Sequence, residues 1–464
     1  MLVNRSQIIW TVFLLSVASL AARGASDLRL VDAAERQEKT VVGVLVKQHV
    51  DVNTPQADGA TALHWAAHWD DIDMLDILIR AGALVNAAND HGVTPLWLAC
   101  ANGNAATARH LLTAGANANL TLSTGETPLM AAARSGNVDL VNALLANKAD
   151  VNARETRSGQ TALMWAAAEG HPTVTRALID NKADIHLRSA HGFTALLFAA
   201  RQGDVESAGG LIAAGADVNE RAPDGSSALL IATASGQETV ALLLLDKGAN
   251  PNLADSNGYA PLHAIVWKAT AKVGLVKRDG TSTLVKALIA HGANPNLQII
   301  NDPPPLPGSY IYASGLTGAT PLWLAAKAAD TGVMRALVAD GADLQLRNKA
   351  GASPLMVAAG LGQAKGPGSV PESRLLEAVK VAVELGADLN AVNEAGQTAV
   401  HGAAAGGFNT IIQFLAEKGA RLDVKDKRGQ TPLNATDRPN SDLGSTADLL
   451  RQLTGETVPG SPRR

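Results

Sequence analysis

The stretch Thr94-Pro95-Leu96-Trp97-Leu98-Ala99-Cys100 decides the fold, because variants of it recur along almost the whole chain. Ten further copies keep a Leu or Val at the third position, and they begin at Thr61, Thr127, Thr161, Thr194, Ser227, Ala260, Thr320, Ser353, Thr398 and Thr431. The first seven starts, Thr94 included, lie 33 or 34 residues apart, and the later gaps are 60, 33, 45 and 33. A fixed period of this size predicts a stack of repeated structural units.

Each unit has the pattern of a helix pair. The Thr or Ser suits the N-cap, where its hydroxyl accepts an early backbone amide, and a following Pro suits the first helical position. A Gly such as Gly103 or Gly136 ends the first helix. An apolar stripe such as 138–145 then predicts a second helix. One such pair cannot bury its own apolar side, so stability must come from stacking.

These residues closely resemble the ankyrin repeat, with T-P-L-x-x-A-A, a Gly, a Leu pair and then G-A-D-V-N, over roughly residues 57–436. The resemblance implies an all-α, ankyrin-type helix-pair solenoid of about twelve repeats with three insertions, whose hairpin-like loops project from one edge. Lys148 and Lys182 stand where the motif has a helix-ending Gly, and each should cost about 1 kcal/mol if the backbone is left-handed there. His186, Gln345 and Asp423 replace the closing Asn, so we expect altered bonding in those turns.

The chain divides where the repeat pattern changes. We assign 25–56 to a degenerate N-terminal capping repeat, 57–436 to the array, 437–454 to a C-terminal capping helix and 455–464 to a disordered tail. The insertions lie at 267–281, 297–318 and 360–374. Insertions in repeat arrays map to loops, often on the binding face, although surface loops also lengthen at little entropic cost. We favour a function for 297–318 and leave both interpretations open for 360–374.

Residues 1–24 have the pattern of a secretory signal peptide. Arg5 supplies a positive start, 8–22 is an almost unbroken apolar run, and small residues follow at Ala21, Ala22, Gly24 and Ala25. The run is short for a membrane span of about 20 residues. We therefore expect this segment to be cleaved, at a position that the pattern leaves open. The mature chain is expected to be an exported bacterial protein, periplasmic or secreted, without a membrane span. An uncleaved anchor is the alternative.

Composition and single residues argue against several functions. The net charge of −4, without a basic helix or arm, gives no basis for nucleic-acid binding. Cys100, the one cysteine, takes the second Ala position of the motif, which predicts a small buried side chain. His64 and His68 lie at i and i+4 near two aspartates and resemble half a metal site. However, His64 occupies the motif position where the family's His bonds between neighbouring loops. We expect no metal, no cofactor and no enzyme.

The functional prediction rests on surface positions. In ankyrin-like folds, partners commonly bind along the concave face, through loop tips and the ends of the first helices. We transfer these positions to this chain and add the tyrosines beside the insertions. The candidate partner-binding residues are then Trp69, His91, His191, Phe193, Arg201, Tyr259, Trp267, Lys268, Tyr310 and Tyr312. Aromatic residues and Arg anchor many interfaces. The alternative for the tyrosines is that they pack the long insertion onto the solenoid. Motif aromatics expected in the core are Trp65, Trp97, Trp165, Phe198 and Trp323.

These observations favour a monomeric, non-catalytic scaffold that binds another protein outside the cytoplasm. The first alternative is a ligand-binding protein or enzyme that uses a pocket formed by the insertions around 267–318. The charged residues there, Lys268, Lys272, Lys277, Arg278 and Asp279, form no recognisable catalytic set. A second alternative is an exported effector that acts inside another cell, for which no dedicated signal is evident.

Overall fold

The computed structural model describes residues 27–271, 283–302, 315–363, 369–436 and 443–456. These residues form 23 α-helices, one 3-10 turn and, outside the helices, a single isolated bridge between Arg221 and Ser227. The prediction of an all-α helix-pair solenoid is confirmed. The signal peptide predicted for 1–24 and most of the tail predicted for 455–464 lie outside the described residues, and the domain boundaries stay predictions.

The chain divides into two compact units, which we describe separately. Unit 1 comprises residues up to 199 together with 206–216, and unit 2 comprises 200–205 and the chain from 217 onward. The helices of unit 1 are α2 (Arg29–Glu35), α3 (Lys39–Lys47), α4 (Ala62–His68), α5 (Ile72–Arg80), α6 (Pro95–Ala101), α7 (Ala105–Thr113), α8 (Pro128–Ser135), α9 (Val138–Ala146), α10 (Ala162–Glu169), α11 (Pro172–Asp180) and α13 (Val205–Ala213). Helix α12 (Ala195–Gln202) has residues in both units, and the first residue of α13, Val205, is assigned to unit 2.

Unit 2 continues the same alternation. Its elements are α14 (Ala228–Ser235), α15 (Glu238–Asp246), α16 (Pro261–Ala271), α17 (Thr283–Ala290), α18 (Pro321–Lys327), α19 (Thr331–Ala339), α20 (Pro354–Ala358), α21 (Glu372–Glu384), α22 (Ala399–Gly406), α23 (Asn409–Glu417), the 3-10 turn η1 (Asn434–Thr436) and α24 (Gly444–Thr454). Helices α2 to α23 make eleven pairs. The last motif copy shortens its first helix to η1, so α24 closes a twelfth, degenerate pair.

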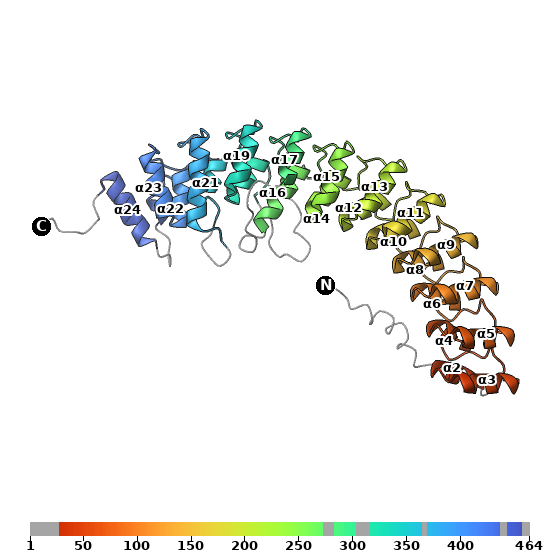
Figure 1. Cartoon of the computed structure of the whole chain (residues 1–464). Helices are drawn as coiled ribbons and strands as arrows, with labels where there is room; N and C mark the ends of the chain where they lie inside the picture. The colour runs from red at the N-terminus through yellow and green to blue at the C-terminus, as the bar shows by residue number, and fades with distance from the viewer. Residues whose placement is uncertain (1–26, 272–282, 303–314, 364–368, 437–442, 457–464) are drawn as a thin grey trace. The chain divides into compact units, whose positions relative to one another are not determined.

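Within each unit the helices form two layers (Figure 1). In unit 1 the first helices α4, α6, α8 and α10 pack on one another in turn, and the second helices α5, α7, α9 and α11 do the same beside them. In unit 2, α16, α18 and α20 form the corresponding first layer. The motif leucines lie in this packing, and Leu63, Leu96 and Leu129 are at most 1% exposed. Each pair therefore buries its apolar side against its neighbours, as the repeat pattern predicts.

The motif start caps the first helix, as predicted. The hydroxyl of Thr94 accepts the backbone amide of Trp97 at 3.1 Å, and Ser353 caps α20 in the same way. Several first helices end at a left-handed Gly, for example Gly136 with φ 75°. Lys148 and Lys182 are also left-handed, with φ 62° and 68°, which confirms that these side chains stand where the repeat requires a glycine-like backbone.

The closing Asn of a repeat ties it to the next repeat, which is more than the local turn role expected from the sequence. Asn119 Nδ2 donates to the carbonyl of Lys148 at 2.9 Å, and its Oδ1 accepts the amide of Asp150 at 2.7 Å. The same pair of bonds is made by Asn53, Asn86, Asn252 and Asn296. Gln345, which replaces this Asn, reaches the carbonyl of Gly386 at 3.4 Å.

We call the pair of hydrogen bonds made by each closing Asn an Asn bridge. Two of these Asn bridges join residues on either side of an insertion. The bond from the amide of Asp150 to Asn119 spans 31 residues, whereas Asn252 accepts the amide of Asn294 across 42 residues and Asn296 accepts that of Asp343 across 47. The three distances are nevertheless 2.7, 2.7 and 2.8 Å. Added residues therefore leave the contact between neighbouring repeats unchanged.

The insertions are not loops along their whole length. Helix α16 runs to Ala271 and α21 begins at Glu372, so the first and third insertions partly extend helices. Asp302 closes the base of the second insertion, because its carboxylate accepts the amides of Gly315, Leu316 and Thr317 at 2.7 to 2.8 Å. The expectation of three loop insertions is therefore corrected for residues 267–271 and 372–374.

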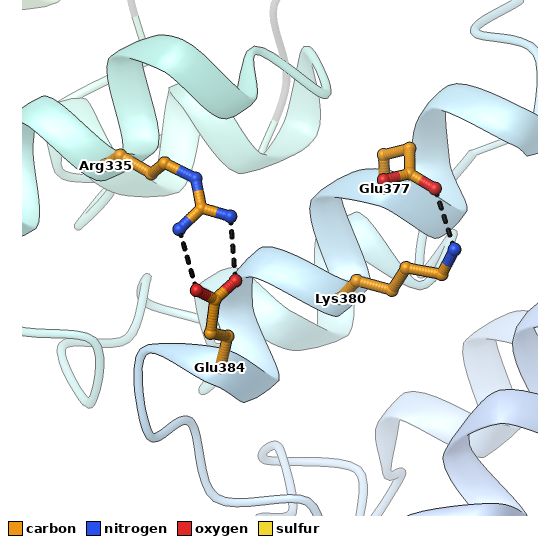
Figure 2. A network of polar contacts seen from close by, with 4 residues as sticks. All are labelled: Arg335, Glu377, Lys380 and Glu384. Atoms are coloured by element: carbon orange, nitrogen blue, oxygen red, sulfur yellow. Dashed lines mark hydrogen bonds and ion pairs between the residues drawn. The ribbon is translucent and has the colours of Figure 1, made fainter.

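An exposed ion-pair network lies on the second helices of unit 2 (Figure 2). Arg335 on α19 donates to both carboxylate oxygens of Glu384 on α21, at 3.1 and 2.7 Å, and Lys380 pairs with Glu377 at 2.8 Å. The direct hydrogen bonds raise the pKa of Arg335 and lower that of Glu384. Because both pairs are open to solvent, we assign Arg335 and Glu384 to the surface contact between α19 and α21, and Lys380 and Glu377 to the exposed side of α21, rather than to a site.

Motif histidines join the hairpins of adjacent repeats, as the resemblance implies. His64 Nδ1 accepts the amide of Thr61 at 3.0 Å, and its Nε2 donates to the carbonyl of Val93 at 2.9 Å. His263 and His401 make the equivalent bonds to the next hairpin at 3.0 and 3.2 Å. We call these three residues the hairpin histidines.

Replacing Lys148 or Lys182 by Gly is expected to raise the free energy of unfolding by about 0.5–1 kcal/mol. Relief of left-handed strain gains about 1–2 kcal/mol, and the greater freedom of Gly in the unfolded chain offsets part of it. Chemical denaturation measures the change. Lys148→Ala is the control, because it removes the charge but keeps the strain; an equal gain from Ala would contradict the backbone explanation.

Stability is expected to fall as the pH decreases from about 6.5 to about 4. Burial lowers the pKa of His263 to about 4 and also lowers those of His64 and His401. The unfolded state therefore binds protons more readily than the folded state, so acid favours unfolding. His263 alone should remove roughly 3 kcal/mol by pH 4.

The matched variant for this pH dependence is His263→Met, since Met130 and Met164 occupy the same motif position in other repeats. Urea denaturation of both proteins between pH 4 and pH 7 tests the assignment. The variant should show a shallower loss of stability in acid. An unchanged slope would mean that other groups control the pH dependence.

Candidate protein-binding surface

The first-helix face of unit 1, meaning the outward sides of its first helices and its hairpin tips, carries an aromatic cluster at the end of α4. The cluster consists of Trp65, His68 and Trp69. The two indoles lie nearly parallel with ring centroids 6.2 Å apart, and the imidazole stands edge-on to Trp69 at 4.6 Å. Spacings of three and four residues place the three side chains on one helix side.

Hydrogen bonds hold both indoles of the cluster in place. Trp69 Nε1 donates to the carbonyl of Glu35 in the preceding repeat at 3.1 Å, and Trp65 Nε1 donates to Gln56 at 2.9 Å. Trp69 nevertheless leaves 39% of its surface exposed. The arrangement therefore presents a fixed aromatic surface to solvent, as predicted for Trp69.

A small hollow lies beside the cluster, between α4 and the next hairpin. Its lining residues are Ala60, His64, Trp65, His68, Asn89, Val93 and Leu98. His64 is occupied by its hairpin bonds, and Asn89 Oδ1 accepts the amides of His91 and Val93 at 3.0 and 2.9 Å. Burial lowers the pKa of His68, so this side chain is neutral at neutral pH. Such an uncharged, largely apolar surface suits contact with another molecule rather than reaction with it.

A cation lies over an aromatic ring further along the same face. The guanidinium of Arg134, at the end of α8, is 4.9 Å from the ring centroid of Trp165 on α10. Burial raises the pKa of Glu126 in the neighbouring hairpin, although Arg134 opposes the shift. The indole nitrogens of Trp97 and Trp165 are buried without a hydrogen-bond partner in the described part of the chain. The sequence predicted neither the pairing of Arg134 with Trp165 nor these two unpartnered donors.

The core assignment of the motif aromatics holds in part. Phe198 and Trp323 are buried, at 5% and 3% exposure, as predicted. Trp65, Trp97 and Trp165 keep part of their surface exposed, so their assignment to the core is corrected. At the position of Trp65 and Trp165 other repeats have Leu98, Ala131 or Leu324, and the larger indole extends beyond the volume that these side chains fill. Trp97 shares its motif position with the buried Trp323, so size alone does not explain its exposure.

The other predicted residues of the first part of the chain lie on hairpins and at a helix end. His91 and His191 are exposed at hairpin tips, and Arg201 is exposed near the end of α12. Phe193 is half-buried and its ring lies 5.6 Å from that of Phe198. These positions agree with the transfer from the ankyrin pattern, and whether a partner contacts them stays a prediction.

Residues predicted around the insertions are only partly described. Tyr259 is half-buried, its ring stacks on His263 at 5.7 Å, and its hydroxyl donates to the carbonyl of His263 at 3.4 Å. Burial raises the pKa of this phenol. Trp267 is half-buried on α16. The side chain of Lys268, and Tyr310 and Tyr312, lie outside the described residues, so an aromatic cluster there stays a prediction.

The residues weighed for metal or thiol chemistry have structural partners. Asp71 caps α5 by accepting the amide of Met74 at 2.9 Å, and Asp70 accepts the hydroxyl of Thr107 at 2.5 Å. Cys100 is fully buried, which raises the pKa of its thiol. Across the described ranges, no three His, Cys, Asp or Glu side chains gather as a metal site would require.

The longest helix within the described residues is α21, with 13 residues. None of the helices in the described segments combines the length and the apolar character needed to cross a bilayer.

Comparisons with known proteins agree with the repeat architecture. A family model for three copies of the ankyrin repeat matches residues 30–121, 98–189, 129–222 and 196–299. A model for many copies matches 373–416, and a single-repeat model matches 317–349.

Two known proteins are similar to parts of the chain. The ankyrin repeat-containing protein P1E11.10 of Schizosaccharomyces pombe is 29% identical over 76 residues, which are 16% of this chain and 35% of that protein. This chain thus matches about a third of the length of that relative. The crystal structure of the human ASB11 ankyrin repeat domain is 29% identical and covers 48% of this chain and 98% of that one, with a TM-score of 0.44. Because the three-copy model alone spans 30–299, more than half of the 464 residues, the chain belongs to the ankyrin repeat family.

Proposed function

We propose that this chain is a non-catalytic scaffold that binds a protein partner through its first-helix face and hairpin tips, outside the cytoplasm. Ankyrin repeat domains generally mediate protein–protein interaction, and their fold is typically not that of an enzyme. The observation that carries the proposal is Trp69, a large aromatic side chain that is 39% exposed within an ordered cluster.

The chemistry of the cluster supports binding. Trp is among the residues that contribute most to protein interfaces, particularly at the centre of the contact. The bond from Trp69 to Glu35 fixes the indole before a partner arrives, so little side-chain entropy is lost on binding. The apolar hollow beside Trp65 extends the same surface.

Tyr259 fits the packing interpretation better than the binding one. Its ring stacks on His263 and its hydroxyl bonds within its own repeat, and both contacts serve the fold. Trp69 differs because its ring contacts leave a larger apolar surface open. We therefore place the main anchor of the partner in unit 1.

Replacing Trp69 by Ala is expected to weaken partner binding by about 2 kcal/mol or more, roughly 30-fold. The same change should lower the free energy of unfolding by about 1 kcal/mol, because the bond to Glu35 is lost. Affinity capture with the mature protein as bait, from the native extracytoplasmic fraction, followed by affinity measurement with the captured protein, tests binding. Denaturation measures stability.

Leu84→Ala is the matched control, because Leu84 is 62% exposed and lies in the turn after α5, away from the cluster. It should change neither quantity. Trp69→Phe keeps an aromatic ring without the indole donor and should retain most of the affinity. If a folded Trp69→Ala protein binds the partner with unchanged affinity, the proposal that Trp69 anchors the partner is wrong.

Export is a separate part of the proposal, supported by the pattern of residues 1–24. The mature chain should begin near residues 22–25 and be recovered outside the cytoplasm. N-terminal sequencing of the native protein after fractionation tests this. An intact Met1 on exported protein would indicate an anchor instead, and recovery in the cytoplasm would contradict export.

A further inference from the structure

The first-helix face of unit 2 carries a cation in an unusual environment. Lys327 is the last residue of α18 and is half-buried, with its ammonium 5.4 Å from the ring centroid of Trp323. The indole is itself fixed, because Trp323 Nε1 donates to the carbonyl of Ala352 at 3.0 Å. The ammonium of Lys327 therefore lies over a fixed aromatic ring, whereas a surface lysine usually extends its charged end into water.

No carboxylate of the described residues forms an ion pair with Lys327, and two acids of the same unit, Asp330 and Glu372, are engaged by other groups. Asp330 caps α19 by accepting the amide of Val333 at 3.1 Å. Glu372 accepts the amide and the hydroxyl of Thr410 at 2.9 and 2.8 Å. A partly buried charge without a partner is unfavourable, and burial accordingly lowers the pKa of Lys327.

A second cation lies at the same helix end. Arg374 donates to the carbonyls of Ala328 and Ala329, which directly follow Lys327, at 3.3 and 3.4 Å. This guanidinium already satisfies the carbonyl groups at the end of α18. Neither Lys327 nor Arg374 forms an ion pair with a carboxylate of the described residues.

Stabilisation of the helix end is the structural explanation for a lysine here, because cations are favourable at helix C-termini. Other repeats show that the helix does not require it. The same motif position holds Ala101, Ala168 and Ala234 in the second, fourth and sixth copies, and the basic residues His68, Arg134 and Arg201 in the first, third and fifth. In the preceding repeat it holds Trp267, on α16, which packs against α18.

We propose that Lys327 receives a carboxylate of the protein partner, so that the first-helix face of unit 2 binds an acidic segment. This inference rests on the proposed scaffold function and adds the chemistry of the partner to it. A carboxylate would neutralise the ammonium in a partly dry setting, where charge pairing is stronger than in water. The neighbouring Trp267 suits an apolar residue beside the acid in the partner sequence.

The test is selection of a random peptide display library on the full-length chain and, in parallel, on Lys327→Met. Met keeps the stem over Trp323 and removes the charge. Peptides selected on the natural chain should be enriched in Asp or Glu next to an apolar residue, and their affinity for Lys327→Met should fall at least tenfold. The variant should unfold at the same or a higher denaturant concentration, because a partly buried charge has been removed.

Lys286→Met is the matched control, since Lys286 is an exposed lysine on α17, a second helix of the same unit, and lies outside the first helices and hairpin tips. It should leave binding of the selected peptides unchanged. Peptides without acidic enrichment, or peptides that bind Lys327→Met as well as the natural chain, would overturn the inference. If such peptides still depend on Trp69, the scaffold function stands while this inference fails; if no peptide binds at all, the scaffold function fails first.

The chain's own Asp279 provides an additional test. It is the one carboxylate in the spans 272–282, 303–314 and 364–368, which the structure leaves out within the repeat array, whereas the span 437–442 near the C-terminal helix holds Asp437 and Asp442. Asp279→Asn should leave acidic-peptide binding unchanged. A tenfold gain in peptide affinity in that variant would show that the carboxylate of Asp279 pairs with the ammonium of Lys327, and would overturn the assignment of that ammonium to a partner.

Discussion

Each helix pair of this chain depends on the next pair for the burial of its apolar side, and the remaining structure follows from that dependence. The motif leucines are covered because neighbouring first helices lie in direct contact. Contact alone does not set the register of the repeats, since apolar packing has little directionality. The register is set by hydrogen bonds, namely the Asn bridges, the hairpin histidines and backbone bonds such as that from the amide of Ser123 to the carbonyl of His91 at 3.0 Å.

Close contact between hairpins also explains a glycine that the repeat keeps. Gly92 has φ 80°, and a Cβ atom there would lie 2.8 Å from the carbonyl oxygen of Thr121 in the next hairpin. Any side chain would force the two hairpins apart. The residue therefore serves both the left-handed turn and the approach of the neighbouring repeat.

Much of the fold was predictable, because capping, helix ends and period are local properties of the sequence. The roles of Thr94, Gly136 and Lys148 follow from the residues themselves. The bridging role of Asn119 was not predicted, because its partners lie a full repeat away and a turn motif gives no sign of them. Trp65 and Trp165 were assigned to the core because the motif position is usually buried, whereas the size of the indole decides their exposure. Of the candidate site, the sequence predicted Trp69 but not its cluster or the environment of Lys327.

The atoms that hold neighbouring repeats together, those of the Asn bridges, belong to other residues than the segments in which the chain changes length. A hydrogen bond from a backbone amide to a bridging Asn closes a segment of 47 residues at Asn296, compared with 31 residues at Asn119. The loop-entropy relation puts the additional entropic cost of closing the longer segment at only about 0.4 kcal/mol. New sequence can thus enter between the helices of a repeat, or at the hairpin that follows, almost without loss of stability. An array of this kind can acquire recognition surfaces by insertion while its folding remains a matter of neighbouring repeats.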